Sequence, residues 1–280
     1  MNSKRITIRL MTYFFLLALA VFTVFPVLYA VLGAFKTNAE VTLGGTILPQ
    51  TWIFTNFPEA WTNANFARYT LNTLYTCVFT TIGSVLVASM SGFVVSRKTF
   101  WGKKVLMGAI LATMFLSVGA ITLRPLYVLM LRLGLHRSLW SIILIQVATS
   151  QGANIFLVSR FVSAVPKELD EAAHIDGANL FQIYRMIILP LITPILGVVG
   201  LFAFRYSWND YVLPSIFTMT RESMRTLTVG VVSLRYGESA AAQWNLMLAG
   251  ASIAIIPMLI VYVIANKQFM SGLTAGAVKG

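Results

Sequence analysis

Six long apolar runs constrain this sequence more than any other feature. A helix that crosses a bilayer takes about 20 predominantly apolar residues. Unpaired backbone groups are so costly in lipid that such runs fold as helices. The predicted spans lie near residues 11–33, 71–95, 105–131, 138–160, 186–206 and 246–266. The sequence therefore predicts an all-α, polytopic membrane protein with six transmembrane helices.

The composition agrees with this fold class. Hydrophobic residues make up 58% of the 280 residues and charged residues 11%, and the mean hydropathy is +0.78. A soluble domain carries about 25% charged residues. The formal charge of +12 does not indicate nucleic-acid binding, because the basic residues flank apolar runs instead of forming one solvated face. The single cysteine, Cys77, lies inside an apolar run and excludes an internal disulfide.

The basic residues predict the orientation, because lysine and arginine concentrate in short cytoplasmic segments. With both termini on one side, that side holds 12 of the 21 basic residues, all close to predicted span ends. They are Lys4, Arg5, Arg9, Arg97, Lys98, Lys103, Lys104, Arg160, Lys167, Arg185, Lys267 and Lys279. We therefore expect both termini to be cytoplasmic in a bacterial inner membrane.

The same pattern predicts the organisation of the chain. Residues 1–33 form an N-terminal cytoplasmic segment and a first anchor helix, residues 34–70 an external loop, and residues 71–280 the core transmembrane domain. A cytoplasmic loop occupies about 161–186, and a cytoplasmic tail occupies 267–280. The first apolar run could instead be a cleaved secretory signal, although it exceeds the usual apolar length of about 7–15 residues.

The residues that catalysis or cofactor binding would need are missing from the sequence. Gly102-Lys103 is followed by Lys104 instead of Ser or Thr, so no phosphate-binding loop is present, and no two glycines are spaced as in a dinucleotide fingerprint. The two histidines, His136 and His174, fall on opposite predicted sides of the membrane, which argues against a histidine metal site. We expect no catalysis, no metal and no cofactor in this chain, and energy supplied from elsewhere.

The acidic residues are concentrated at one place. Four of the nine acidic residues, Glu168, Asp170, Glu171 and Asp176, lie at or near the start of a predicted cytoplasmic helix. Carboxylates stabilise a helix N-terminus, and Gly177 can adopt the left-handed conformation that closes a helix. An apolar helix is expected to follow and to stop at Pro190. The residues alone leave two interpretations open: an ordinary solvated helix, or an element that docks into a partner.

The stretch resembles the EAA loop of bacterial ABC-importer permeases. That pattern is EAA, three residues, Gly, nine residues, Ile, any residue and Leu-Pro, and the chain matches it with Glu171-Ala172-Ala173, Gly177, Ile187 and Leu189-Pro190. The segments "WNDYVLP" at 208–214 and "GLTAGAVKG" at 272–280 are similar to the carbohydrate branch, and to the second permease of maltose-type importers. The resemblance covers nearly the whole chain and implies the type I ABC-importer transmembrane fold.

The resemblance implies a set of partners. The family assembles two permease subunits, here expected as a heterodimer, with two cytoplasmic ATPase subunits that bind ATP and Mg, and with an external solute-binding protein. The helix of the EAA loop would be the coupling helix that docks into the ATPase. Its expected docking residues are Glu168, Glu171, Ala172, Ala173, Asp176 and Gly177.

Two further contacts follow from the resemblance. The tail, with Gly272, Gly276 and Lys279, would reach the ATPase, unless it is a free end. The loop near 234–244, with Tyr236, Gly237 and Glu238, would contact the solute-binding protein. Because this loop departs from the maltose version, a plain connecting loop is an equal alternative.

Polar residues inside spans are candidates for a substrate path, because they are costly in lipid. They are Arg124, Gln146, Gln151, Asn154, Asn209 and Asp210. Hydrogen bonding between helices is the alternative for each.

The predicted function is the permease subunit of an ATP-driven importer for a sugar or oligosaccharide. The alternatives are an importer for glycerol-phosphate or another non-sugar solute, an ion-gradient-driven carrier, and a membrane scaffold or receptor subunit without transport.

Overall fold

The computed structural model describes residues 2–115, 119–236 and 242–277, and all regular structure within these ranges is helical. The α-helices are α1 (Asn2–Gly33), α2 (Asn38–Leu43), α3 (Asn56–Asn63), α4 (Phe66–Arg97), α5 (Lys103–Phe115), α6 (Leu123–Arg132), α7 (Leu139–Thr149), α8 (Gln151–Ala164), α9 (Glu168–Ile175), α10 (Leu180–Ile183), α11 (Leu189–Asn209), α12 (Val212–Phe217), α13 (Leu227–Ser233) and α14 (Trp244–Ala277). Short 3-10 turns are η1 (Gly119–Thr122), η3 (Glu222–Met224) and η4 (Leu234–Tyr236), and η2 (Tyr184–Ile188) is a π-helix.

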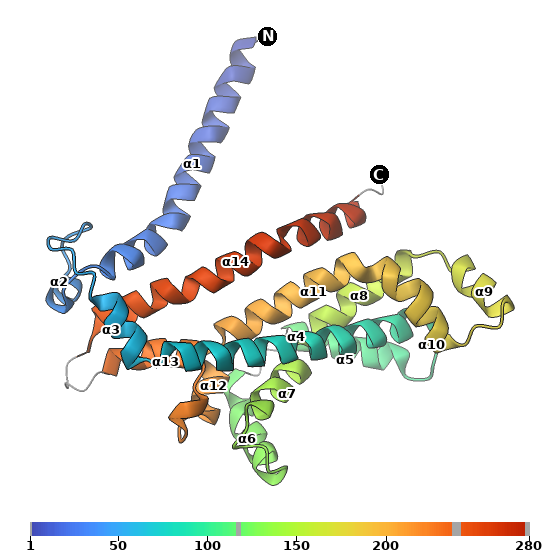
Figure 1. Ribbon diagram of the computed structural model, residues 1–280. Coiled ribbons are helices and arrows are strands. Elements are labelled where there is room, and N and C mark those ends of the chain that lie inside the picture. The colour runs from blue at the N-terminus through green and yellow to red at the C-terminus, as the bar shows by residue number, and fades with distance from the viewer. Residues whose placement is uncertain (1, 116–118, 237–241, 278–280) are drawn as a thin grey trace. The chain divides into compact units, whose positions relative to one another are not determined.

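The chain divides into two compact units, and the helices of each can be found by their labels in Figure 1. Unit 1 comprises Met1–Ala67 and Gly230–Ile256, and unit 2 comprises Arg68–Val229 and Pro257–Gly280. Unit 1 contains α1, the segment that follows it, and the first part of α14. Unit 2 contains the helices from α5 to α12 and most of α4.

Four helical segments are long and apolar enough to cross a membrane: Ile8–Gly33, Phe66–Arg97, Leu180–Asn209 and Trp244–Ile264. The pair Leu139–Thr149 and Gln151–Ala164 also qualifies if it counts as one span, although the two helices are bent by 50°. The described residues thus contain four or five candidate spans. The all-α prediction is confirmed, and the predicted count of six is not.

The count differs because two expected spans are interrupted. Near 105–131, the described helices are α5, of 13 residues, and α6, of 10 residues, with the 3-10 turn η1 directly before α6. Neither described α-helix by itself has the about 20 residues that a bilayer core takes, and residues 116–118 lie outside the described residues. In the expected span 138–160, polar residues around Ser150 separate α7 from α8. A hydropathy average does not detect such local breaks.

The core of unit 2 joins α4, α8, α10, η2 and α11. Its buried residues are Ala88, Phe93, Val158, Val162, Ile183, Tyr184, Ile188, Ile192, Ile195, Val198 and Val199. A Cβ atom on Gly92 would lie 2.6 Å from Val158 Cγ1. The absence of a side chain at this position therefore lets α4 and α8 approach closely, as small residues do between membrane helices. Helix α9, which follows α8 in the chain, packs against this core.

Candidate functional site

Helix α9 begins where acidic residues favour a helix N-terminus. Glu168, Asp170 and Glu171 occupy its first turn, where each exposed carboxylate stabilises the helix by about 0.3–1 kcal/mol. Lys167 at the N-cap makes no side-chain capping bond. Pro166 stands just outside the helix. The charge of the first turn therefore takes over part of the role of a capping side chain.

Gly177 ends α9 and reverses the chain. Its φ is +82°, in the left-handed region that costs other residues about 1–2 kcal/mol. The Gly177 N–H donates to the His174 carbonyl at 3.1 Å, and the Ala178 N–H donates to the Ala173 carbonyl at 2.9 Å. These two bonds form a Schellman closure. The sequence prediction for this glycine is thus confirmed in its backbone conformation.

A capping box starts α10 two residues later. The Asn179 side chain accepts a hydrogen bond from the Gln182 N–H at 2.9 Å, and the Gln182 side chain accepts one from the Asn179 N–H at 2.7 Å. Both ends of the turn from 176 to 179 are therefore fixed by hydrogen bonds. Helix α9 and the helix that follows it are joined by a defined corner.

An ion pair anchors α9 to the end of α4. Arg97 Nε lies 2.7 Å from Asp170 Oδ2, and the two side chains are only 5% and 19% exposed. Arg97 Nη2 also donates to the Val165 carbonyl at 2.9 Å, in the link between α8 and α9. Ala173 packs against the core of unit 2 on the same side of α9. One residue of α4 thus holds both the beginning of α9 and the segment that precedes it.

The opposite face of α9 is exposed. Five of the six predicted docking residues, Glu168, Glu171, Ala172, Asp176 and Gly177, are exposed, and Ala173 is half-buried. The sequence prediction missed the apolar part of this face, since Leu169 and Ile175 are also exposed. It also missed Asp170 as an anchor, because its partner Arg97 is distant in the sequence. The exposed face combines carboxylates with apolar and small side chains.

The helix after the corner does not stop at Pro190, so that prediction is wrong. Pro190 lies in the first turn of α11, and the helical path continues to Asn209. The π-helix η2 precedes it, where the Leu189 N–H donates to the Tyr184 carbonyl five residues back. This wider turn moves the preceding carbonyls away from the proline ring, which would clash with them in a regular α-helix.

Two predicted substrate-path residues, Gln146 and Asp210, belong to one buried polar cluster in unit 2. Gln146 Oε1 accepts from Thr80 Oγ1 at 3.0 Å and from Ser207 Oγ at 2.8 Å, while Gln146 Nε2 donates to Asp210 Oδ2 at 2.9 Å. The backbone carbonyl of Asp210 accepts from Thr228 Oγ1 at 2.7 Å. Asp210 follows the last residue of the Leu180–Asn209 segment. Burial raises the pKa of its carboxyl, and the bond from Gln146 opposes that shift.

This cluster joins α4, α7 and the end of α11, so it matches the alternative of hydrogen bonding between helices.

We expect Gln146→Leu to lower the melting temperature of the purified protein by about 5 °C or more, because Asp210, Thr80 and Ser207 lose a buried partner. Differential scanning fluorimetry measures this change. Gln151→Leu is the matched control, since Gln151 Nε2 bonds only the Val147 carbonyl of the preceding turn. Equal losses in both variants would contradict a structural role for the cluster.

The other predicted substrate-path residues do not join this cluster. Arg124 is exposed at the start of α6, Asn154 is buried in α8, and Asn209 Nδ2 bonds the Arg205 carbonyl of its own helix. In unit 1, Tyr236 is exposed. Gly272 and Gly276 lie in α14, while Gly237, Glu238 and Lys279 lie outside the described residues. Across the described ranges, no group of three or more His, Cys, Asp or Glu side chains could hold a metal ion.

Similar proteins are bacterial permeases. The galactooligosaccharides transport system permease protein GanQ of Bacillus subtilis is 31% identical over 287 residues, covering 100% of this chain and 99% of GanQ. The maltodextrin transport system permease protein MdxG of the same organism is 29% identical over 280 residues, covering 100% of this chain and 99% of MdxG.

The fold is shared with a solved structure. A chain from the crystal structure of a bacterial ABC transporter involved in the import of the acidic polysaccharide alginate matches with a TM-score of 0.78. The identity is 24%, and the match covers 96% of this chain and 98% of that chain. The model of the family described as "Binding-protein-dependent transport system inner membrane component" matches residues 84–270. With a match over more than half of its length, this multi-pass membrane protein belongs to the family of binding-protein-dependent transport system inner membrane components.

Proposed function

We propose that this chain is one of two permease subunits of an ATP-driven importer for a sugar or oligosaccharide, with α9 as the element that docks into a cytoplasmic ATPase. The observation that carries this proposal is the two-sided character of α9. Asp170 and Ala173 hold it to unit 2, while Glu168, Glu171 and Ala172 face outward. A helix built only for solubility needs no buried ion pair beneath it.

The attachment of α9 explains how a displacement would reach the membrane helices. Arg97 connects it to α4, the chain connects it to α8, and the fixed corner at Gly177 connects it to α10 and α11. A docked ATPase would therefore move α4, α8, α10 and α11 through one short helix. In this account the exposed Glu171 makes charge-assisted hydrogen bonds to the partner.

The remaining parts of the importer come from the family. We propose a second, different permease subunit, two ATPase subunits that bind ATP and Mg, an external solute-binding protein, and no hydrolysis by this chain. We further propose that both termini lie on the cytoplasmic side and that the chain has six spans in a type I importer arrangement. The docking set is Glu168, Glu171, Ala172, Ala173, Asp176 and Gly177, and the tail with Gly272, Gly276 and Lys279 is a second ATPase contact.

The substrate class rests on the relatives. GanQ and MdxG are named for galactooligosaccharides and maltodextrins, and the structural neighbour imports an acidic polysaccharide. These solutes share many hydroxyl groups and differ in charge. We propose a carbohydrate as the solute, and Tyr236, Gly237 and Glu238 as a contact for the protein that delivers it.

Uptake by the reconstituted complex tests this function. The chain is purified with its associated subunits, which mass spectrometry identifies, and is placed in liposomes with the solute-binding protein. We expect uptake of a galactooligosaccharide or maltodextrin that requires ATP and the ATPase, and no uptake of glycerol-phosphate. Uptake driven by an ion gradient without ATP, or selective uptake of glycerol-phosphate, would contradict the proposal.

A further inference from the structure

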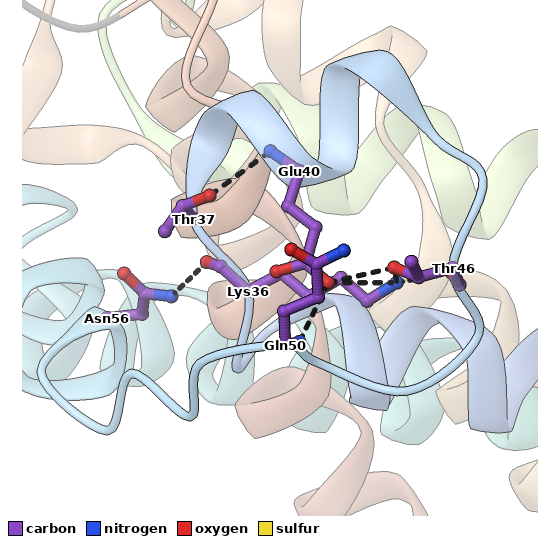
Figure 2. A network of polar contacts seen from close by, with 6 residues as sticks. All are labelled: Lys36, Thr37, Glu40, Thr46, Gln50 and Asn56. Carbon is purple, nitrogen blue, oxygen red and sulfur yellow. Dashed lines mark hydrogen bonds and ion pairs between the residues drawn. The ribbon is translucent and has the colours of Figure 1, made fainter.

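The segment that follows α1 in unit 1, residues 34–57, has two charged side chains, and both are largely buried. Between residues 34 and 57 the charged residues are Lys36 and Glu40. Lys36 is 2% exposed and the Glu40 side chain 10% exposed, and Lys36 Nζ lies 3.9 Å from Glu40 Oε1. Thr46 contacts both side chains (Figure 2): Lys36 Nζ donates to its carbonyl, and Thr46 Oγ1 donates to Glu40 Oε1 at 2.8 Å. The Gln50 N–H donates to the same oxygen at 3.0 Å.

Asparagine side chains fix the ends of this segment. Asn56 Nδ2 donates to the carbonyls of Ala34 and Lys36 at 2.8 and 2.9 Å. Asn38 binds the start of α14 in the same unit: its Nδ2 donates to the Ala242 carbonyl at 2.8 Å, and its Oδ1 accepts from the Trp244 N–H at 2.9 Å. The segment therefore has a defined conformation that is maintained by internal polar contacts.

The outside of the segment combines large apolar side chains with uncharged polar ones, which include Thr42, Gln50 and Thr51. Leu43 is 86% exposed and Phe54 is 66% exposed, and Ile47, Leu48 and Trp52 are also exposed. No charged residue lies between Glu40 and Glu59. Water-soluble loops place apolar side chains inward and charges outward, and this segment has the reverse arrangement. Exposed apolar patches of this kind mark contact with a membrane or a partner.

We propose that residues 41–54 contact lipid at the bilayer surface next to the Gly33 end of α1. The segment begins directly after Ile8–Gly33, which is long and apolar enough to cross a membrane, so it is continuous with a candidate membrane span. Burial of ionisable side chains in pairs is the arrangement that a lipid environment requires, and tryptophan is enriched at the membrane interface.

Fluorescent labels on single cysteines test the proposal. Leu43→Cys and Leu48→Cys are each made in the full chain, labelled with an environment-sensitive fluorophore, purified with the associated subunits and reconstituted in liposomes. The unlabelled background is the natural chain, whose Cys77 is buried. Glu59→Cys is the matched control, because Glu59 is exposed in α3 of the same unit and its charge belongs in water.

We expect brominated phospholipid to quench the labels at 43 and 48 at least threefold more strongly than the label at 59, and aqueous iodide to show the opposite order. Quenching of all three labels by iodide to the same extent would overturn the proposal. Protection of the labels at 43 and 48 from both quenchers would also overturn it, because a protein would then cover the patch. Protection that appears only on addition of the solute-binding protein would identify that protein as the occupant.

A second measurement tests the role of the buried pair. Glu40→Gln leaves the Lys36 charge without a carboxylate, so we expect lipid quenching of the Leu43→Cys label to fall by at least half. Thr46→Val, which removes only the hydroxyl bond to Glu40, is the milder variant if Glu40→Gln fails to assemble, and a smaller fall in the same direction is expected. Glu59→Gln is the control and should change nothing. Unchanged quenching in both loop variants would overturn the assignment of this pair as the support of the surface.

Discussion

Arg97→Glu should abolish coupled transport while the protein still inserts into the membrane. The substitution places a second carboxylate against Asp170 and removes the donor to the Val165 carbonyl, so α9 loses its attachment to α4. Loss of one partner from a buried ion pair costs about 3–5 kcal/mol, and the partial exposure of Asp170 favours the lower end of that range. A cost of about 3 kcal/mol reduces the attached population about a hundredfold. ATP-dependent uptake in liposomes measures the effect, together with ATPase activity in the same sample.

Three further variants make this result specific. The exchanged pair Arg97→Asp with Asp170→Arg restores opposite charges and should recover part of the uptake, whereas Asp170→Arg alone should not. Lys98→Glu is the matched control for charge, because Lys98 is exposed and adjacent to Arg97. Uptake that is lost equally in Lys98→Glu would indicate a general effect of cytoplasmic charge, and normal uptake in Arg97→Glu would refute the anchor.

Gly177→Pro should have a comparable effect through the backbone alone. Proline fixes φ near about −65° and has no N–H, whereas Gly177 has φ +82° and donates to the His174 carbonyl. The Schellman closure is therefore impossible, and the corner between α9 and α10 must change. We expect uptake and co-purification of the ATPase to be lost, with a normal amount of protein in the membrane.

A graded series at the same position separates conformation from other effects. Gly177→Ala should retain part of the uptake, because a Cβ atom there meets nothing within 4 Å and the cost is only the conformational strain of about 1–2 kcal/mol. Gly177→Asn should retain more, since asparagine tolerates the left-handed region. Gly108→Ala, at an ordinary helical position with open space around it, is the control and should behave like the natural protein. Full uptake and ATPase binding in Gly177→Pro would show that this corner has no part in coupling.

The sequence predicted the features of the candidate site that depend on neighbouring residues. Acidic residues before Ala172 and a glycine at 177 determine the start and the end of α9 through local interactions, and both are present as expected. The attachment of α9 could not be predicted in this way. Arg97 belongs to a distant helix, and nothing in its surroundings in the sequence distinguishes it from the exposed Lys98 beside it.

The errors in the fold have a related cause. Hydropathy averages over about 20 residues found the long helices, but they do not detect the bend between α7 and α8 or the 3-10 turn η1 before α6. The expected stop at Pro190 applied a rule for regular α-helices, and the π-helix Tyr184–Ile188 removes the clash on which that rule depends. Gln146 and Asp210 were candidates for a substrate path because they are polar in apolar surroundings, with hydrogen bonding between helices as the alternative. The structure shows that each provides the hydrogen-bond partner of the other.

The 50° angle between α7 and α8 has a mechanical consequence. A straight helix transmits a force along its axis from one end to the other. A bent pair of helices converts part of an axial force on one helix into a lateral force on the other. Any shift of α8 along its own axis must therefore press laterally on α7. The polar cluster around Gln146 connects α7 to α4 and to the end of α11 by hydrogen bonds. A lateral force on α7 would therefore act on those two helices.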